Sequence, residues 1–479
     1  MTRRLAALRL LLVLSFCNVA LAQPTGTFTP TGSMTTPRFS HRSTLLADGR
    51  VLIAGGLTFE AECYCSKILA SAEIYDPSSG TFTPTGEMVT PRDAFTSTFT
   101  LLPDGKVLAT GGHKIGQALA SAEVYDPQTG KFAVTGSMTT PRWGHTATLL
   151  NSGKVLIAGG ATDATAELYD PSTGTFTATG SMSNPWADTA TLLPNGDVLI
   201  TGGNPDGPAH SSADLYDPAT GTFASIADMN ANHPESTAVL LPNGNVLVAG
   251  AYFADPGSSS KIAELFNPAI DTFARTGNMT YDRGRNTATL LPDGAVLFTG
   301  GSHEGSIDAS IYNLATAELY DPVTGRFRST GSMTRSRELH AATLLNDGTV
   351  LITGGDEIVW PSGILASAEI YTPAVLVPVL NVTDLQFDRI NAVAGSSYSV
   401  NVSGSNLTAQ TFFDVRFISP GSNESVVVLN WQKGLTASHE VAAGIATGSW
   451  KITGVRAHEI ETDHTGNFFP VSSTITVSP

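Results

Sequence analysis

The sequence predicts an all-β protein in which a seven-bladed β-propeller, closed by the N-terminal strand, precedes a separate β-sandwich. Two observations lead to the propeller: one unit recurs seven times at spacings of 43 to 56 residues, and each unit contains four short strands separated by turns. A third observation is that the recurrence stops near residue 377. We expect residues 1–22 to be a signal peptide, 23–376 the propeller and 377–479 the sandwich.

Each unit carries the same landmarks in the same order. One methionine opens every unit, at Met34, Met88, Met138, Met182, Met229, Met279 and Met333. A diglycine follows the second strand, beginning at Gly55, Gly111, Gly159, Gly202, Gly300 and Gly354, with Gly250-Ala251 in the fifth unit. The turn between the first two strands is mostly Asn-Gly or Asp-Gly, which accepts the positive φ angles of tight hairpins. Radial stacking of such units would bury both faces of every sheet.

The N-terminal segment supplies a strand that the last unit lacks. A phenylalanine marks the fourth strand of each unit, and the first of these, Phe28, precedes any hairpin. The last unit ends at Tyr371-Thr372-Pro373 with no fourth strand after it. We therefore expect the strand around Phe28 to complete the last sheet, closing the ring and removing its exposed edges.

The combination of Arg-x-x-His before the first strand, the diglycine and the later Tyr-Asp-Pro resembles kelch-repeat propellers. The resemblance runs from about Gly26 to Pro373 and implies the fold. It implies no particular activity, because one propeller architecture hosts many functions.

The C-terminal hundred residues alternate apolar and polar side chains in short runs separated by Gly, Asn and Ser clusters. This pattern is typical of an antiparallel β-sandwich. The segment lacks a Cys-Trp-Cys pattern, so we expect an immunoglobulin-like domain in architecture alone. Trp431 and Trp450 are expected in its core.

The N-terminus has the features of an export signal. Arg3, Arg4 and Arg9 precede a short apolar run, and Ala20-Leu21-Ala22 provides a cleavage pattern before Gln23. A lipoprotein signal ending at Cys17 is the alternative. The run is too short to span a membrane, and no later segment is apolar enough. We expect a secreted protein, either periplasmic or extracellular, with association with the cell surface as a further option.

The charge and cysteine content of the chain limit the classes of ligand that it could bind. The formal net charge of −16 disfavours nucleic acid, because phosphate binding needs a basic surface. Cys63 and Cys65 are the cysteines that remain after the signal. We expect surface thiols or a local crosslink there, with metal or redox chemistry as the alternative.

A propeller followed by such a sandwich also resembles the galactose oxidase group of copper-radical enzymes. That resemblance implies a copper ion held by two histidines and two tyrosines, one tyrosine being joined to a cysteine. His340 falls near the group's Tyr-His pair, but Leu339 precedes it. No first strand begins with a tyrosine that a cysteine could join. We therefore expect no copper-radical set, no other metal and no cofactor.

The starts of the first strands should lie near the propeller axis at one mouth. Alignment on the Leu-Leu pairs makes seven residues equivalent: His41, Ser97, His145, Asp188, Ser236, Asn286 and His340. With neighbouring aromatic and charged residues they yield a candidate ligand-binding set of His41, Trp143, His145, Trp186, Asp188, Glu235, Arg285 and His340. Indole rings next to polar groups would suit a sugar. The alternative is that the histidines belong to the repeat and support neighbouring backbone.

A second position is acidic in all seven units: Glu73, Glu123, Glu167, Asp214, Glu264, Glu318 and Glu369. Catalytic residues are usually unique, whereas a position filled in every repeat serves the repeat. We expect a structural role, with hydrogen bonds to Arg38, Arg92 or Arg142 or to the backbone.

These features favour an exported binding protein that recognises a carbohydrate or a cell-surface protein through propeller loops and the axial mouth. The longer insertions all follow second strands and should emerge on one face, where specificity usually resides. The alternative is a carbohydrate-active enzyme, such as an epimerase, lyase or copper oxidase-like protein. The sequence leaves the oligomeric state open.

Overall fold

The computed structural model describes residues 25–60, 65–93, 97–114, 116–202, 211–251, 261–304, 311–357, 363–375, 381–387, 391–393, 397–405, 407, 411–420, 425–440, 447–459, 464–465 and 469–478. The predicted signal peptide and Cys63 lie outside these residues, and Cys65 is disulfide-bonded. All regular secondary structure in the described part is β-strand. The described part of the chain contains no helix long and apolar enough to cross a membrane.

Seven four-stranded antiparallel sheets occupy the described residues between Thr27 and Thr372. In chain order, sheets one to three are β2-β3-β6-β7 (Arg42–Leu45, Val51–Ala54, Ala72–Asp76, Thr81–Pro84), β8-β9-β12-β13 (Ser97–Leu101, Val107–Gly111, Ala122–Asp126, Lys131–Val134) and β14-β15-β16-β17 (Thr146–Leu149, Val155–Ala158, Thr165–Asp170, Thr175–Ser181). Sheets four and five are β18-β19-β20-β21 (Thr189–Leu192, Val198–Thr201, Ala213–Asp217, Thr222–Ser225) and β22-β23-β24-β25 (Thr237–Leu240, Val246–Ala249, Ala263–Asn267, Thr272–Arg275). Sheet six is β26-β27-β30-β31 (Thr287–Leu290, Val296–Thr299, Ala317–Asp321, Arg326–Ser329), and sheet seven is β32-β33-β34-β1 (Ala341–Leu344, Val350–Thr353, Ala368–Thr372, Thr27–Pro30).

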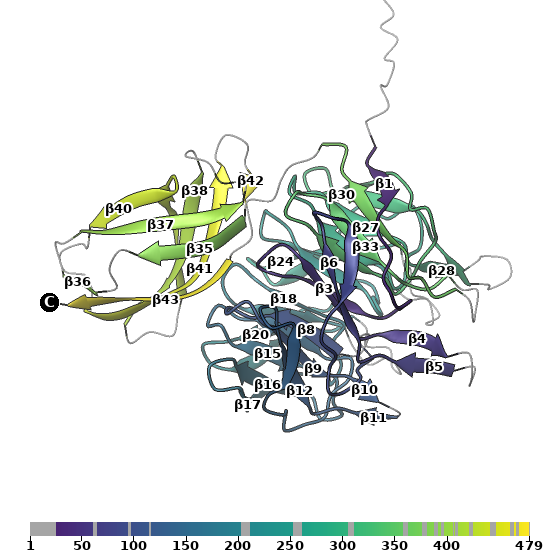
Figure 1. The fold of residues 1–479 in the computed structure, drawn as a ribbon, viewed down its shortest axis with the longest axis horizontal. Helices are drawn as coiled ribbons and strands as arrows, with labels where there is room; N and C mark the ends of the chain where they lie inside the picture. Colours follow the sequence, from purple (N-terminus) through teal and green to yellow (C-terminus); the bar gives the residue numbers. More distant parts are fainter. Residues whose placement is uncertain are drawn as a thin grey trace, which may run out of the picture.

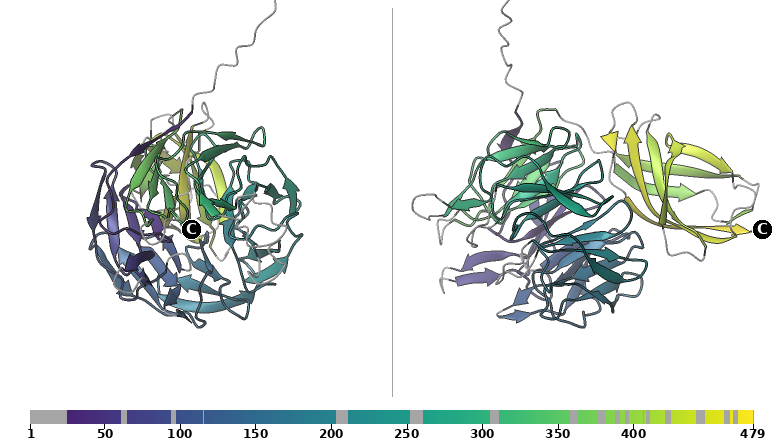
Figure 2. Two further views of the ribbon diagram at one scale, coloured as in Figure 1. Left: turned by 90° about the vertical axis from the view of Figure 1, so that its right-hand side faces the viewer. Right: turned by 180° about the vertical axis from the view of Figure 1, so that it is seen from behind.

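The first strands of neighbouring sheets contact each other around a closed ring, and β32 of sheet seven meets β2 of sheet one. Figure 2 shows this ring along its axis. The second strand of every sheet is fully buried, because its apolar side chains pack against the sheets on both sides. The cluster between sheets seven and one joins Leu345 and Leu351 to Val51 and Ile53.

The N-terminal strand closes sheet seven as the sequence predicts. Strand β1 pairs antiparallel with β34, and Phe28 lies opposite Tyr371. The two rings are 4.8 Å apart between centroids. The ends of the ring are therefore joined by backbone hydrogen bonds, and β1 covers the outer edge of β34.

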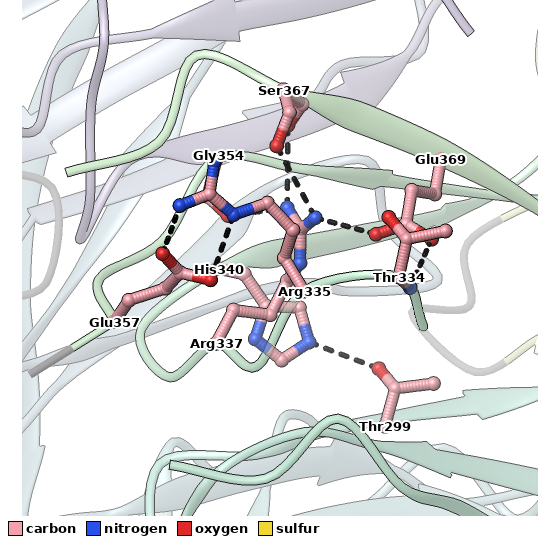
Figure 3. Close-up of polar contacts among 9 residues, drawn as sticks. All are labelled: Thr299, Thr334, Arg335, Arg337, His340, Gly354, Glu357, Ser367 and Glu369. Atoms are coloured by element: carbon pink, nitrogen blue, oxygen red, sulfur yellow. Dashed lines mark hydrogen bonds and ion pairs between the residues drawn. The ribbon is translucent and has the colours of Figure 1, made fainter. Parts of the chain in front are cut away.

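The acidic position of each unit lies inside its sheet, and the predicted structural role is confirmed. In sheet seven, Arg337 donates to Glu369 Oε1 at 2.7 Å and to the carbonyl of Gly354 at 2.7 Å, while the backbone N–H of Thr334 donates to Glu369 Oε2 (Figure 3). The same pairing recurs as Arg38–Glu73, Arg92–Glu123, Arg142–Glu167 and Arg283–Glu318, and His233 takes the arginine's place beside Glu264. These pairs are buried, so loss of either partner would leave the other group buried without a compensating contact, which is strongly destabilising.

A second repeated contact joins a threonine hydroxyl to a buried tyrosine. Thr276 Oγ1 and the hydroxyl of Tyr320 are 2.8 Å apart, and five other sheets make the equivalent bond. Sheet five has Ile226 and Phe266 at these positions, and the two pack in one core cluster. Both polar partners are lost together there, so no buried hydroxyl is left unpaired.

The C-terminal domain consists of two sheets. One contains β35 (Asn381–Phe387), β37 (Ser397–Ser405) and β40 (Thr436–Glu440). The other contains β36 (Asn391–Val393), β43 (Phe469–Ser478), β41 (Gly448–Glu459), β38 (Phe412–Ile418) and β39 (Ser425–Lys433), with β42 (His464–Thr465) beside β41. The core includes Val400, Phe413 and Val455, and the predicted core residues Trp431 and Trp450 pack against it half-buried.

Three short hairpins project from one face of the ring (Figure 1). They are β4–β5 (Leu57–Glu60, Cys65–Ile68), β10–β11 (His113–Lys114, Gln117–Ala118) and β28–β29 (Ser302–Glu304, Ile311–Asn313). Each follows a second strand, as predicted for the insertions. The C-terminal domain lies beside the opposite face (Figures 1 and 2), where Arg416 donates to Asn151 in the turn between β14 and β15.

Candidate functional site

The alternation of strand direction brings two kinds of loop to the hairpin face. These are the segments that enter each first strand and the segments that leave each second strand. Isolated β-bridges tie them together, pairing Phe39 with Leu57, Gly284 with Ser302, and Glu338 with Asp356. Each of the seven aligned positions and the two residues before it form what we call a mouth segment. Phe39–His41 and Glu338–His340 are examples.

The three histidines of the mouth segments point between sheets instead of toward one another. His340 Nε2 is 2.9 Å from the hydroxyl of Thr299 in the preceding sheet (Figure 3). His145 makes the same contact with Thr110 at 3.0 Å, and His41 with Thr353 at 2.8 Å. All three are buried. This geometry supports the structural interpretation, with threonine side chains instead of backbone as the partners.

Burial keeps these imidazoles neutral. It lowers the pKa of His145 and of His340 to about 3, and a nearby arginine, Arg142 or Arg337, adds to the effect. The pKa of His41 is lowered well below its usual value for the same reason. A neutral, hydrogen-bonded ring that fits against the diglycine of the preceding sheet is a packing element.

Four other mouth residues form a connected charged arc across sheets four to seven. The backbone of Glu235 lies close enough to the carboxyl group of Asp188 to favour its charged form. Arg285 Nε donates to Glu235 Oε2 at 2.8 Å, and its NH1 atom lies 3.8 Å from Glu338 Oε1. Ser302 Oγ donates to the other oxygen of Glu338 at 2.6 Å. We call Asp188, Glu235, Arg285 and Glu338 the charged arc.

The backbone holds the charged arc in an uncommon conformation. Glu235 and Arg285 have φ angles of 53° and 56°, and the equivalent residues Leu339 and Ser40 have 50° and 53°. Side chains other than glycine rarely adopt this left-handed region. Backbone bonds run from sheet to sheet along the same positions, since Ser40 N–H donates to Leu339 O and Leu339 N–H to Arg285 O. Outliers of this kind cluster at functional sites.

Two carboxyl groups of the arc have raised pKa values. Burial, and then the charge of Glu235, raises the pKa of Asp188 to about 8, and Asp188 Oδ2 is buried without a hydrogen-bond partner. Burial also raises the pKa of Glu338, which the Ser302 bond and Arg285 oppose. Asp188 is therefore neutral at pH 7 beside Glu235, whose carboxylate is bonded to Arg285.

The two tryptophans of the candidate set, in the mouth segments of sheets three and four, contact each other. Trp143 and Trp186 are 5.0 Å apart between centroids in an edge-to-face arrangement, and Trp143 is 40% exposed. They occupy the same aligned position, two residues before His145 and Asp188. Phe39 is equivalent in sheet one, whereas Glu338 is equivalent in sheet seven. The mouth segments of sheets three and four thus carry contacting indoles, and those of sheets four to seven carry the charged arc.

Of the candidate residues, the structure brings Asp188, Glu235 and Arg285 together, and separately Trp143 and Trp186. It does not bring the histidines into either group. Sequence reasoning missed Glu338 and Ser302. Glu338 could have been found as the charged residue at the aligned position that other units fill with aromatic side chains, but Ser302 belongs to an insertion without a repeat counterpart.

Comparison with known proteins places the fold. The Kelch motif family model matches residues 38–89. A fungal alcohol oxidase of the AA5 family, solved in complex with copper, matches with a TM-score of 0.65 and 17% sequence identity, over 95% of this chain and 100% of that one. The comparison with curated proteins found no match.

In the part of the chain that the structure describes, the histidine and tyrosine side chains considered for a copper site have other partners. Within the described residues, no group of three or more His, Cys, Asp and Glu side chains could hold a metal ion. His340 is bonded to threonine, and the repeated tyrosines, such as Tyr320 and Tyr371, are buried against threonines inside the sheets. The likeness to that oxidase shows the fold alone. The chain carries the Kelch motif and is a kelch-type β-propeller with a galactose-oxidase-like fold.

Proposed function

We propose that this chain is an exported binding protein that recognises a carbohydrate at its axial mouth. In this proposal the seven sheets are the blades of one kelch-type propeller, residues 1–22 direct export, and residues 377–479 form an immunoglobulin-like domain. A cell-surface protein ligand is the other partner class expected from kelch propellers.

The observation that carries the proposal is that the mouth segments contain both a pair of contacting indoles, in sheets three and four, and the charged arc of sheets four to seven. Trp143 offers an exposed ring beside Trp186, and sugars pack their apolar faces on such rings. The charged arc offers both donors and acceptors, which suits hydroxyl groups. A few directed polar groups beside an aromatic surface are typical of small-ligand sites.

One observation favours a second candidate function, a carbohydrate-active enzyme. Asp188, whose raised pKa keeps it neutral, lies near Glu235, which is paired with Arg285, and enzymes can divide acid and base roles between two carboxyl groups in unlike surroundings. Product formation from polysaccharides, with Asp188→Asn inactive and Trp143→Ala active at high substrate, would support the enzyme.

A glycan array on the purified chain, followed by titration calorimetry with any bound glycan, tests the binding proposal. Trp143→Ala should weaken affinity about tenfold or more, because aromatic anchors dominate such sites. Val134→Ala is the matched control, since Val134 is also exposed but lies on β13, an outer strand. If no glycan binds, or both variants bind equally, the carbohydrate proposal is wrong, and a protein ligand would be sought by the same substitutions.

Export has its own test. N-terminal sequencing of the protein recovered from the periplasm or medium of an expressing bacterium should begin at Gln23. A cytoplasmic chain that retains Met1 would contradict the proposed signal.

A further inference from the structure

Sheet four lacks the buried arginine or histidine that every other sheet places beside its acidic residue. Asp214 occupies the acidic position there and is 4% exposed. Its Oδ2 atom accepts from the backbone N–H of Ser183 at 2.8 Å and from the Ser183 hydroxyl at 2.9 Å. Its Oδ1 atom is buried and has no partner in the described part of the chain.

The cause is the length of the segment that enters the first strand. From Met182 to Asp188 it is one residue shorter than the equivalent segment of sheet three, from Met138 to His145. Counted forward from Met182, Trp186 stands where the other units have arginine or histidine. Counted back from Asp188, it stands where sheet three has Trp143. The indole packs edge-to-face on Trp143 at the mouth, so it does not replace the guanidinium inside the sheet.

The other sheets show which atoms a guanidinium joins. In sheet seven, Arg337 donates to the carbonyl oxygens of Gly354 and Ser367, to Ser367 Oγ and to Glu369 (Figure 3). Arg38 makes the same four contacts in sheet one, with Gly55, Ser71 and Glu73. Every one of these acceptors is an oxygen atom.

Sheet four keeps the oxygens of this set. Gly202 and Ser212 are equivalent to Gly354 and Ser367, and the Gly202 N–H donates to Ser212 O at 3.1 Å, as Gly354 N–H does to Ser367 O. The Ser212 hydroxyl donates to Gly202 O at 2.5 Å. Two carbonyl oxygens, one hydroxyl and the free carboxyl oxygen of Asp214 therefore belong to the guanidinium position. Aspartate is also one methylene shorter than glutamate, which leaves more room.

We propose that this position in sheet four is a binding site for a monovalent metal cation, Na⁺ or K⁺, held by Asp214 Oδ1, the carbonyl oxygens of Gly202 and Ser212, and Ser212 Oγ. A single carboxylate with neutral oxygens balances one positive charge, and hard cations select oxygen ligands. Burial of a carboxylate without a counter-charge is unfavourable, which gives the cation its binding energy. The site does not depend on the function proposed for the mouth.

Thermal unfolding of the full chain in 150 mM NaCl, KCl or choline chloride tests the site. Sodium or potassium should raise the melting temperature by about 2–4 °C over choline at equal ionic strength, as expected for a ligand that binds the folded state alone. Asp214→Asn should abolish this difference. Asp228→Asn is the matched control, because Asp228 is exposed and its loss removes the same charge from the surface.

Crystals soaked in rubidium chloride provide the direct measurement. An anomalous peak between Asp214 and Gly202, absent from Asp214→Asn crystals, is the expected result. Equal melting temperatures in the three salts, or no peak in the soaked crystals, would overturn the proposal and leave an ordered water as the occupant. A shift that survives in Asp214→Asn would equally refute it.

Discussion

Replacement of Thr276 by valine should destabilise the propeller more than the simultaneous loss of Thr276 and its tyrosine partner. Tyr320 is fully buried, and Thr276 Oγ1 lies 2.8 Å from its hydroxyl. Valine leaves that hydroxyl buried without a partner, which costs about 1–3 kcal/mol. Burial also raises the pKa of Tyr320, so the phenol cannot escape the loss by ionising at neutral pH.

The companion substitution has a smaller effect. In Tyr320→Phe, Thr276 Oγ1 still donates to Gly325 O at 3.3 Å, so we expect about 1 kcal/mol. In the double variant Thr276→Val/Tyr320→Phe no hydroxyl remains, and Gly325 O still accepts from Gly277 N–H at 2.9 Å. The double variant should therefore be more stable than the sum of the single changes by about 1–2 kcal/mol.

Urea denaturation of the four full-length proteins, followed by far-UV circular dichroism, measures the cycle. Sheet five supplies the reverse experiment: Phe266→Tyr should destabilise the chain, and Ile226→Thr added to it should recover part of the loss. Additive effects in both sheets, or a harmless Thr276→Val, would refute the argument from unpaired hydroxyls.

Three further predictions concern single residues. Gly300→Ala should lower the melting temperature more than Gly105→Ala, because both have positive φ but an added Cβ overlaps Arg337 O and His340 only at Gly300; equal losses would contradict the role of close approach. The pKa of His340, about 3 in the folded chain, lies below its ordinary value, so stability should fall as the pH drops from about 6.5 toward 3, and His340→Gln should flatten a melting-temperature scan over that range. The pKa of Asp188, about 8, lies above its ordinary value, so stability should fall as the pH rises from about 4 to 8, and Asp188→Asn should melt higher than the parent at pH 8.5 but not at pH 4; no gain at pH 8.5 would contradict the raised pKa.

Much of the propeller could be predicted because its signals repeat. The pairing of the strand around Phe28 with the last sheet and the structural role of Glu369 and its equivalents are confirmed. Both follow from local chemistry present in every unit, such as a turn, a fourth strand or a buried charge. Each signal is weak in a single unit, but its recurrence at the same position in seven units makes the prediction reliable.

The candidate site was harder to predict because it arises where the repeat is broken. The arc from Asp188 to Glu338 joins residues of different sheets, and its links depend on left-handed backbone at Glu235 and Arg285. Neither side-chain direction nor φ can be read from one unit. For the histidines the sequence left two interpretations open, a ligand site or a role in the repeat, and the threonine partners in adjacent sheets support the second.

The strand that closes the ring has a consequence for how the chain folds. Gly26 N–H donates to Thr330 Oγ1, 304 residues away in sequence, and β1 pairs with β34 still further along. Contacts of such long range form slowly, because the chain entropy of a large loop must be lost before they can stabilise anything. During synthesis, sheets one to six can form as they emerge, while β1 waits for the end of the propeller. The ring therefore closes last, and until then the outer edge of β34 and the whole of β1 are open to pairing with other chains.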